Sequence, residues 1–120
     1  MNSFRNKSWV VDKNNQYVDF FRMQFALYDS VKHIQNTGQI TDDEYRKANL
    51  FFVVIYNDQD LINLVPLYNR SFSLIIASPD PQMLKKLEHL EYAYPLNLSA
   101  SKDMLDLESK AILNNISSFA

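Results

Sequence analysis

Hydrophobic and polar positions alternate along this chain in two repeating patterns. Short apolar runs are each followed by a segment in which apolar residues recur at helical spacing. The clearest runs are 50–56, where every residue is apolar, and 72–77, which is rich in β-branched residues. The pattern predicts five strands, each followed by a helix, with the strands at 8–11, 30–35, 50–56, 72–78 and 92–98.

The first two predicted helices have recognisable stripes or start signals. In segment 14–30, with Asn14 or Asn15 as candidate cap, the apolar stripe comprises Val18, Phe21, Phe25 and Tyr28. In segment 40–49, Thr41 and Glu44 have the spacing of a capping box. Acidic residues follow Thr41 in the first turn, where they suit the helix dipole.

The last three predicted helices are more varied. Segment 58–71 contains Pro66, which can start, kink or split a helix, and its stripe comprises Leu61, Leu64, Val65 and Tyr68. Segment 78–90 has Asp80 as candidate cap, Pro81 at the first helical position and a stripe of Met83, Leu84, Leu87 and Leu90. Ser101 is the candidate cap of the final helix, whose expected inner face comprises Met104, Leu105, Leu107, Ala111, Ile112 and Ile116.

Two strands that are apolar on both faces predict a parallel sheet covered by helices on both sides. Strand–helix alternation at this spacing predicts right-handed crossovers and one doubly wound α/β domain over 1–120, a three-layer sandwich. Such sheets bind ligands beyond the carboxyl ends of their strands. Asp12, Asn57, Asp58 and Ser78 are therefore expected near one edge of the molecule.

Composition excludes several classes of function. The chain has no cysteine, so disulfides, cysteine zinc sites and thiol catalysis are excluded, and one glycine is too few for a phosphate-binding loop. Its net charge of −2 and scattered basic residues argue against direct nucleic-acid binding. No apolar run is long enough for a signal peptide or a membrane span, so we expect a cytoplasmic protein. His33 and His89 have no second ligand at metal spacing and flank no nucleophile motif.

Four short segments carry a resemblance to a known family. These are "WVVDKN" with Asp12, "VVIYND" with Asn57 and Asp58, "IIAS" with Ser78, and "YPLNLS" at the fifth strand. With the (βα)5 order, they make the chain resemble the CheY-like receiver domains of bacterial response regulators, across essentially its whole length. The resemblance implies a flavodoxin-like sheet in the strand order 2-1-3-4-5. It also implies a pocket in which acids hold a divalent metal, an Asp takes a phosphoryl group and a Ser or Thr switches.

This sequence departs from the receiver pattern at its chemical positions. Lys13 stands where a second acid is expected, and Leu96-Asn97 replaces the usual Lys-Pro. Asn57 occupies the phosphoacceptor position, and an amide is not a competent nucleophile. Asp58 tends to face away if Asn57 faces the pocket, because side chains alternate along a strand. We therefore predict a degenerate pseudo-receiver without enzymatic activity and without cofactor; Mg²⁺ belongs only to an active pocket, with Asp12 as its candidate ligand.

The resemblance implies a signalling domain that works through protein–protein contact, with a protein partner or with itself as a homodimer, and without membrane contact. The family's usual interaction surface corresponds here to the fourth helix, fifth strand and fifth helix, with Lys85, Lys86, Tyr92, Tyr94 and Asp103. The domain is compatible with the N-terminal part of a longer regulator in which a DNA-binding output domain follows.

The sequence also fits two other functions. One is an active phosphoacceptor receiver that uses Asp58, and another is a small flavodoxin-like ligand-binding protein or enzyme. For single residues, Asp58 and Asp60 are also candidate helix caps, and Ser78 and Asp12 have capping as an alternative to a pocket role.

Overall fold

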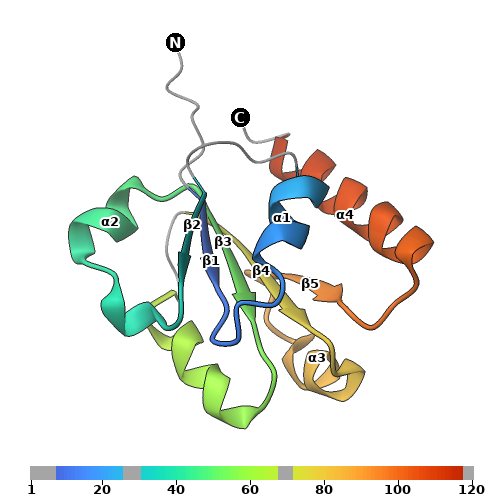
Figure 1. Ribbon diagram of the computed structural model, residues 1–120, viewed down its shortest axis with the longest axis horizontal. Coiled ribbons are helices and arrows are strands. Elements are labelled where there is room, and N and C mark those ends of the chain that lie inside the picture. Colours follow the sequence, from blue (N-terminus) through green and yellow to red (C-terminus); the bar gives the residue numbers. More distant parts are fainter. Residues whose placement is uncertain (1–7, 26–30, 68–71, 118–120) are drawn as a thin grey trace.

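The computed structural model describes residues 8–25, 31–67 and 72–117. Its centre is a five-stranded, all-parallel sheet in the order β2-β1-β3-β4-β5 (Figure 1). The strands are β1 (Ser8–Val11), β2 (Val31–Ile34), β3 (Leu50–Val54), β4 (Ser73–Ser78) and β5 (Tyr94–Asn97). The predicted doubly wound, flavodoxin-like α/β fold and its strand order are confirmed.

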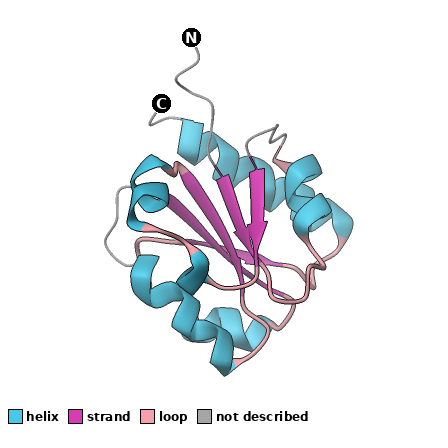
Figure 2. Ribbon diagram, turned by 60° about the vertical axis from the view of Figure 1, so that its left-hand side comes forward, coloured by secondary structure: helices cyan, strands magenta, loops and turns pink. Residues whose placement is uncertain are grey.

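Helices cover both faces of the sheet, which gives three layers (Figure 2). One face packs against α1 (Val18–Gln24) and α4 (Lys102–Ser117). The other packs against α2 (Asp42–Lys47), α3 (Pro81–Leu87) and the 3₁₀ helix η2 (Asp58–Leu67). A short 3₁₀ turn, η1 (Thr37–Gln39), leads from β2 towards α2. Among the described residues, no helix has the length and apolarity needed to cross a membrane.

Neighbouring strand residues point into two separate hydrophobic cores. Trp9 and Val11 of β1 belong to the cluster under α2, η2 and α3, whereas Val10 belongs to the cluster under α1 and α4. In β3, Phe51 and Phe52 divide between the clusters in the same way. Side chains alternate across a strand, so a sheet buried on both faces needs continuous apolar strands.

Local start signals are confirmed at two helices. At α2, the Thr41 hydroxyl accepts the Glu44 N–H at 3.2 Å, and the Glu44 carboxylate accepts the Thr41 N–H at 2.9 Å. At α3, the Asp80 carboxylate accepts the Gln82 N–H, and Pro81 takes the first helical position. Both caps satisfy N–H groups that the first helical turn leaves without partners.

The segment after β3 forms a 3₁₀ helix with Pro66 inside it, and its apolar stripe differs from the predicted one. A 3₁₀ helix has three residues per turn, so residues at i and i+3 lie on one line. Leu64 and Leu67 accordingly face the core, whereas Val65 is 71% exposed. The assignment of Val65 to the inner face was wrong because it assumed the period of an α-helix; Tyr68 lies outside the described residues.

The inner face of α4 was also partly misassigned. Leu105, Ile112 and Ile116 pack on the sheet as predicted, together with Leu113. Met104, Leu107 and Ala111 are instead exposed. They are spaced by three and four residues and form a second apolar stripe on the solvent side of the helix.

The remaining differences are at element ends. α1 begins at Val18 without a side-chain cap, so the proposed caps Asn14 and Asn15 were wrong. Phe25 is buried just past the helix, and Tyr28 lies outside the described residues. Pro95 sits in β5, an edge strand, as expected for a residue without an N–H.

Candidate functional site at the carboxyl edge of the sheet

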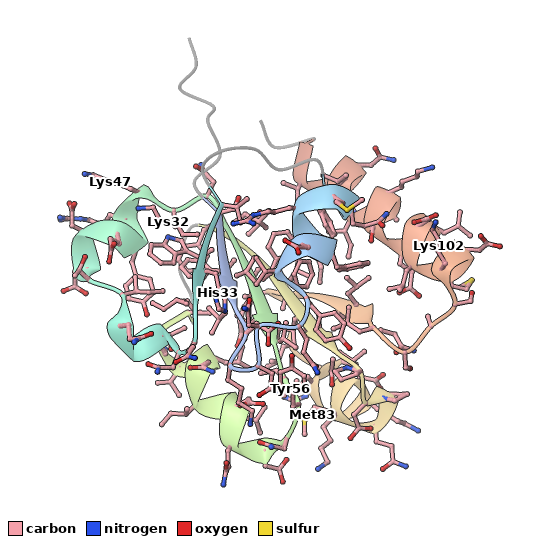
Figure 3. The ribbon with its side chains drawn as sticks, in the orientation of Figure 1. Lys32, His33, Lys47, Tyr56, Met83 and Lys102 are labelled. Atoms are coloured by element: carbon pink, nitrogen blue, oxygen red, sulfur yellow. The ribbon has the colours of Figure 1, made fainter. Side chains whose placement is uncertain are left out.

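The carboxyl ends of β1 and β3 mark the point where the sheet's connections diverge. β1 and β3 are neighbours, but the chain after β1 leads to β2 on one side and the chain after β3 leads to β4 on the other. Ligand sites of doubly wound sheets lie at this switch point. Asp12 follows β1 here. Tyr56, which is labelled in Figure 3, follows β3.

Asp12 is fully buried, and four donors surround its carboxylate. Oδ2 accepts the N–H groups of Gln16 at 2.9 Å and Tyr17 at 2.8 Å. Oδ1 accepts the Asn14 N–H at 3.1 Å and the Tyr56 hydroxyl at 2.5 Å. An ionised carboxylate has about four lone-pair sites, so these donors use its acceptor capacity.

The sequence after Asp12 explains how the loop folds back on the carboxylate. Asn15 has φ of 56°, a left-handed conformation that asparagine adopts more readily than most residues. The resulting turn returns the N–H groups of Gln16 and Tyr17 to Asp12 at the start of α1. Asp12 therefore organises the loop before α1, whereas the adjacent asparagines, predicted as caps of this helix, do not cap it.

A second buried acid, Asp60, organises the loop after β3. Its Oδ2 accepts the N–H groups of Tyr56 at 2.7 Å and Asn57 at 3.2 Å. Its Oδ1 forms an ion pair with Nζ of Lys13 at 3.0 Å. Asp60 therefore binds N–H groups before η2 and is not the cap of a helix near Leu61. Because its carboxylate takes the Tyr56 N–H, the strand ladder ends before residue 56.

Tyr56 joins the two acidic centres. Its hydroxyl donates to Asp12, 44 residues away in the chain, while its N–H donates to Asp60. Nζ of Lys13 lies 5.9 Å from the centre of its ring. Burial raises the pKa of the Tyr56 hydroxyl far above its usual value, and the hydrogen bond to the Asp12 carboxylate adds to the shift. The phenol thus remains a donor to Asp12.

The side chains at the two predicted phosphoacceptor positions do not enter this network. Asn57 is exposed, and its side-chain oxygen accepts the Gln59 N–H at 3.0 Å, which caps η2. Asp58 is exposed and lies 3.6 Å from Nζ of Lys86. Of the four predicted pocket residues, the structure buries Asp12 and Ser78 and leaves Asn57 and Asp58 at the surface.

Ser78 links the ends of β3 and β4. Its hydroxyl donates to the main-chain oxygen of Ile55 at 2.5 Å and accepts the Asp80 N–H at 3.0 Å. The hydroxyl therefore makes two hydrogen bonds at the start of the α3 turn, and Asp80 is the helix cap. At the end of β5, Asn97 accepts the N–H and hydroxyl of Ser99, a local turn.

The His33 side chain also contacts this edge. Its Nε2 lies 2.9 Å from the main-chain oxygen of Asp12, to which an Nε2–H tautomer donates. The contact ties β2 to the same loop. His89 is exposed beyond the end of α3.

The predicted interaction residues are spread around the β5 edge. Lys85 and Lys86 are exposed on α3, and Asp103 is exposed at the start of α4. Tyr92 packs against the core under α2, η2 and α3, whereas Tyr94 packs against the core under α1 and α4. The tyrosines thus belong to opposite faces of the sheet.

A shallow groove of about 330 Å³ opens beside Lys13 and Asp60. Its other lining residues are largely carboxamides: Gln35, Asn36, Gln59 and Asn63, with Ile62. A second hollow of about 470 Å³ shares Asn36, Ile62 and Asn63 with it and continues between η1 and η2. The edge therefore offers space for a small polar molecule next to the ion pair.

The residues at this edge do not fit a divalent cation. Mg²⁺ needs several oxygen ligands in near-octahedral geometry. Asp12 already accepts four hydrogen bonds, and the Lys13 ammonium neutralises Asp60. Among the described residues, no group of three or more His, Asp or Glu side chains is arranged to hold a metal ion.

Sequence reasoning missed three members of this network: Tyr56, Lys13 as an ion-pair partner, and Asp60 as an organiser of the preceding loop. A tyrosine at the end of an apolar run was the available signal, since its hydroxyl needs a partner when it is buried. Comparison of the chain with protein-family models, with curated proteins and with solved structures gives no match.

Proposed function

We propose that this domain is a receiver-like signalling module that acts through protein–protein contacts, without catalysis and independently of phosphorylation. Its surroundings would be cytoplasmic, and its partner is a protein or a second copy of the chain. The fold supports this proposal because its sheet has the strand order of the receiver architecture.

The main observation behind this proposal is that hydrogen bonds already occupy the acceptor positions of the Asp12 carboxylate. A phosphoacceptor pocket needs an acid with free lone pairs for a metal ion and a nucleophilic carboxylate beside it. Here the Asp12 acceptors are used by Asn14, Gln16, Tyr17 and Tyr56. Opening the site for a metal would break these four hydrogen bonds to a fully buried carboxylate, which is costly because hydrogen bonds to charged groups are among the stronger ones. The network therefore favours a single fixed arrangement of the loops at this edge over a pocket that rearranges on phosphorylation.

An amide NMR titration tests the proposal. Magnesium is added first, followed by beryllofluoride as a phosphoryl mimic, and amide shifts are followed at Asp12, Asn57, Asp58 and Ser78. We expect no localised, saturable response from a well-folded sample. Saturation at millimolar magnesium at these four positions would instead support an active receiver.

The alternative of an active receiver places the phosphoryl group on Asp58, whose carboxylate is exposed and accessible. Incubation with a small acyl phosphate, followed by mass spectrometry of the intact protein, tests it directly. A mass gain of one phosphoryl group that Asp58→Ala abolishes would establish this alternative. We expect no such gain, because no cation other than the Lys86 ammonium is paired with this carboxylate among the described residues.

The groove beside Lys13 favours a second candidate function, binding of a small polar molecule. Its carboxamide lining and its place at the switch point are the supporting observations. Native mass spectrometry of the purified protein tests this candidate. A defined adduct that Gln59→Ala removes would establish it, and an adduct-free spectrum would leave the interaction domain as the better explanation.

A further inference from the structure

The solvent side of α4 carries an apolar stripe. Met104 is 47% exposed, Leu107 is 63% exposed and Ala111 is also exposed. At 3.6 residues per turn, these three residues point away from Leu105 and Ile112 of the inner face, by angles of roughly 80–160° around the helix axis. Its spacing of three and then four residues is the spacing of a helix seam that packs against another helix. Figure 1 shows α4 on the outside of the molecule, beside α1.

Opposite charges flank the stripe on one side. Asp103 and Lys110 are seven residues apart, so they occupy the same flank two turns from each other. Both side chains are exposed, and neither forms an ion pair within the described part of the chain. Glu108 lies on the other flank.

We propose that α4 pairs with α4 of a second copy, antiparallel, through Met104 and Leu107, with two symmetric ion pairs between Asp103 and Lys110. The inference rests on the proposed function, since it names the partner for the protein–protein contact. A two-fold axis makes residue i contact residue j and residue j contact residue i. An ion pair between Asp103 of one copy and Lys110 of the other therefore implies a second, symmetric pair between Lys110 of the first copy and Asp103 of the other.

The charges also select the orientation. In an antiparallel pair, each flank faces the same flank of the other helix, so Asp103 lies opposite Lys110 of the second copy. In a parallel pair, opposite flanks meet, and Asp103 would face Glu108 of the second copy with like charge. Flanking charges of this kind fix the orientation of helix pairs. The antiparallel arrangement is therefore the favoured one.

Sedimentation equilibrium from micromolar to millimolar protein tests the proposal. A single helix pair is a small interface, so we expect a monomer–dimer equilibrium within this range. Leu107→Glu and Met104→Glu should each raise the dimer dissociation constant by about tenfold or more, as expected for central apolar contacts. Met23→Glu is the matched control because Met23 is an 82% exposed methionine on a different helix, α1, and is not part of the stripe. It should leave the dissociation constant unchanged.

Charge reversal tests the orientation. Asp103→Lys and Lys110→Asp should each weaken self-association, because each places like charges opposite one another. A mixture of the two variants should form a heterodimer, in which both ion pairs are restored. Circular dichroism verifies that every variant is folded.

A protein that stays monomeric throughout the range, or a dimer that survives Leu107→Glu, would overturn the proposal. Failure of the two charge variants to associate on mixing would overturn the antiparallel orientation. None of these results changes the magnesium and beryllofluoride titration. Failure of the dimer is thus distinguishable from failure of the phosphorylation-independent function.

Discussion

The carboxyl edge beyond β1 and β3 differs from the layer beneath α4 in whether its buried polar groups have hydrogen-bond partners. At the edge, the buried carboxylates of Asp12 and Asp60 are each held by hydrogen bonds or an ion pair. Beneath α4, the Ser109 hydroxyl is completely buried without a hydrogen-bond partner within the described structure, and so is the Ser8 hydroxyl at the start of β1.

The difference shows where the fold depends on specific polar contacts. A buried polar group without a partner costs free energy, whereas a fully satisfied network holds its members in one arrangement. The edge network connects the loops after β1 and β3 through Tyr56, so it fixes the switch point of the sheet. The layer beneath α4 relies on apolar packing, and the buried Ser109 hydroxyl adds no hydrogen bond to it within the described structure.

The largest effect on stability is expected from Asp12→Ala. The change leaves three backbone N–H groups and the Tyr56 hydroxyl without their acceptor. We expect a loss of about 3 kcal/mol in the free energy of unfolding, since a hydrogen bond to a charged group contributes roughly 1.5–3 kcal/mol and water reaches part of the loop once the carboxylate is gone. Urea denaturation followed by circular dichroism measures the loss.

Asp58→Ala is the matched control for this change. It removes a carboxylate that is exposed and only loosely paired with Lys86. We expect a change within about 0.5 kcal/mol, as for most surface substitutions. Equal losses in the two variants would show that the edge network contributes no more than a surface charge does.

The sheet was predictable because its sequence signal is local and repeated. Continuous apolar runs such as 50–56 identify strands buried on both faces, and strand–helix alternation then restricts the topology. The errors occurred where one local pattern fits two geometries. Val65 is an inner residue in an α-helix and an outer one in the 3₁₀ helix that forms. In α4, apolar residues occupy both sides, so periodicity alone does not identify the buried side.

The candidate site was predictable only in part, for a different reason. Strand ends locate Asp12 and Ser78, and the structure buries both. Tyr56 and Asp12 are 44 residues apart, and no local pattern relates them. Lys13 was recognised as a departure from the receiver pattern, but its pairing with Asp60 depends on how two distant loops fold against each other.

A smaller effect is expected from Tyr56→Phe, which removes one donor to Asp12 and keeps the ring. A hydrogen bond to a charged group contributes about 1.5–3 kcal/mol, so we expect a loss near the lower end of this range at neutral pH. Because the Tyr56 pKa is raised in the folded protein, its contribution is fully present below the unfolded pKa and is lost as the pH rises towards the folded pKa.

Denaturation midpoints of the two proteins, measured between about pH 7 and 11, test the pH dependence, since an unfolded tyrosine has a pKa of about 10. Above that pH the unfolded wild-type chain releases the Tyr56 proton and gains stability relative to the folded state. The difference between wild type and Tyr56→Phe should therefore shrink above about pH 10. If the stability difference between wild type and Tyr56→Phe stayed constant across this range, the Tyr56 hydroxyl would have the same pKa in the folded and unfolded states.

The smallest expected effect has the opposite sign and concerns α4. Ser109→Ala removes a buried hydroxyl that has no partner and places a better helix former at that position. We expect the free energy of unfolding to rise by about 0.5–1 kcal/mol. Ser101→Ala is the control on the same helix: its hydroxyl accepts the Met104 N–H at 3.3 Å, so its removal should cost about 0.5–1 kcal/mol. If Ser109→Ala destabilised the protein as Ser101→Ala does, the buried hydroxyl would have a partner after all, and the contrast between edge and helix layer would not hold.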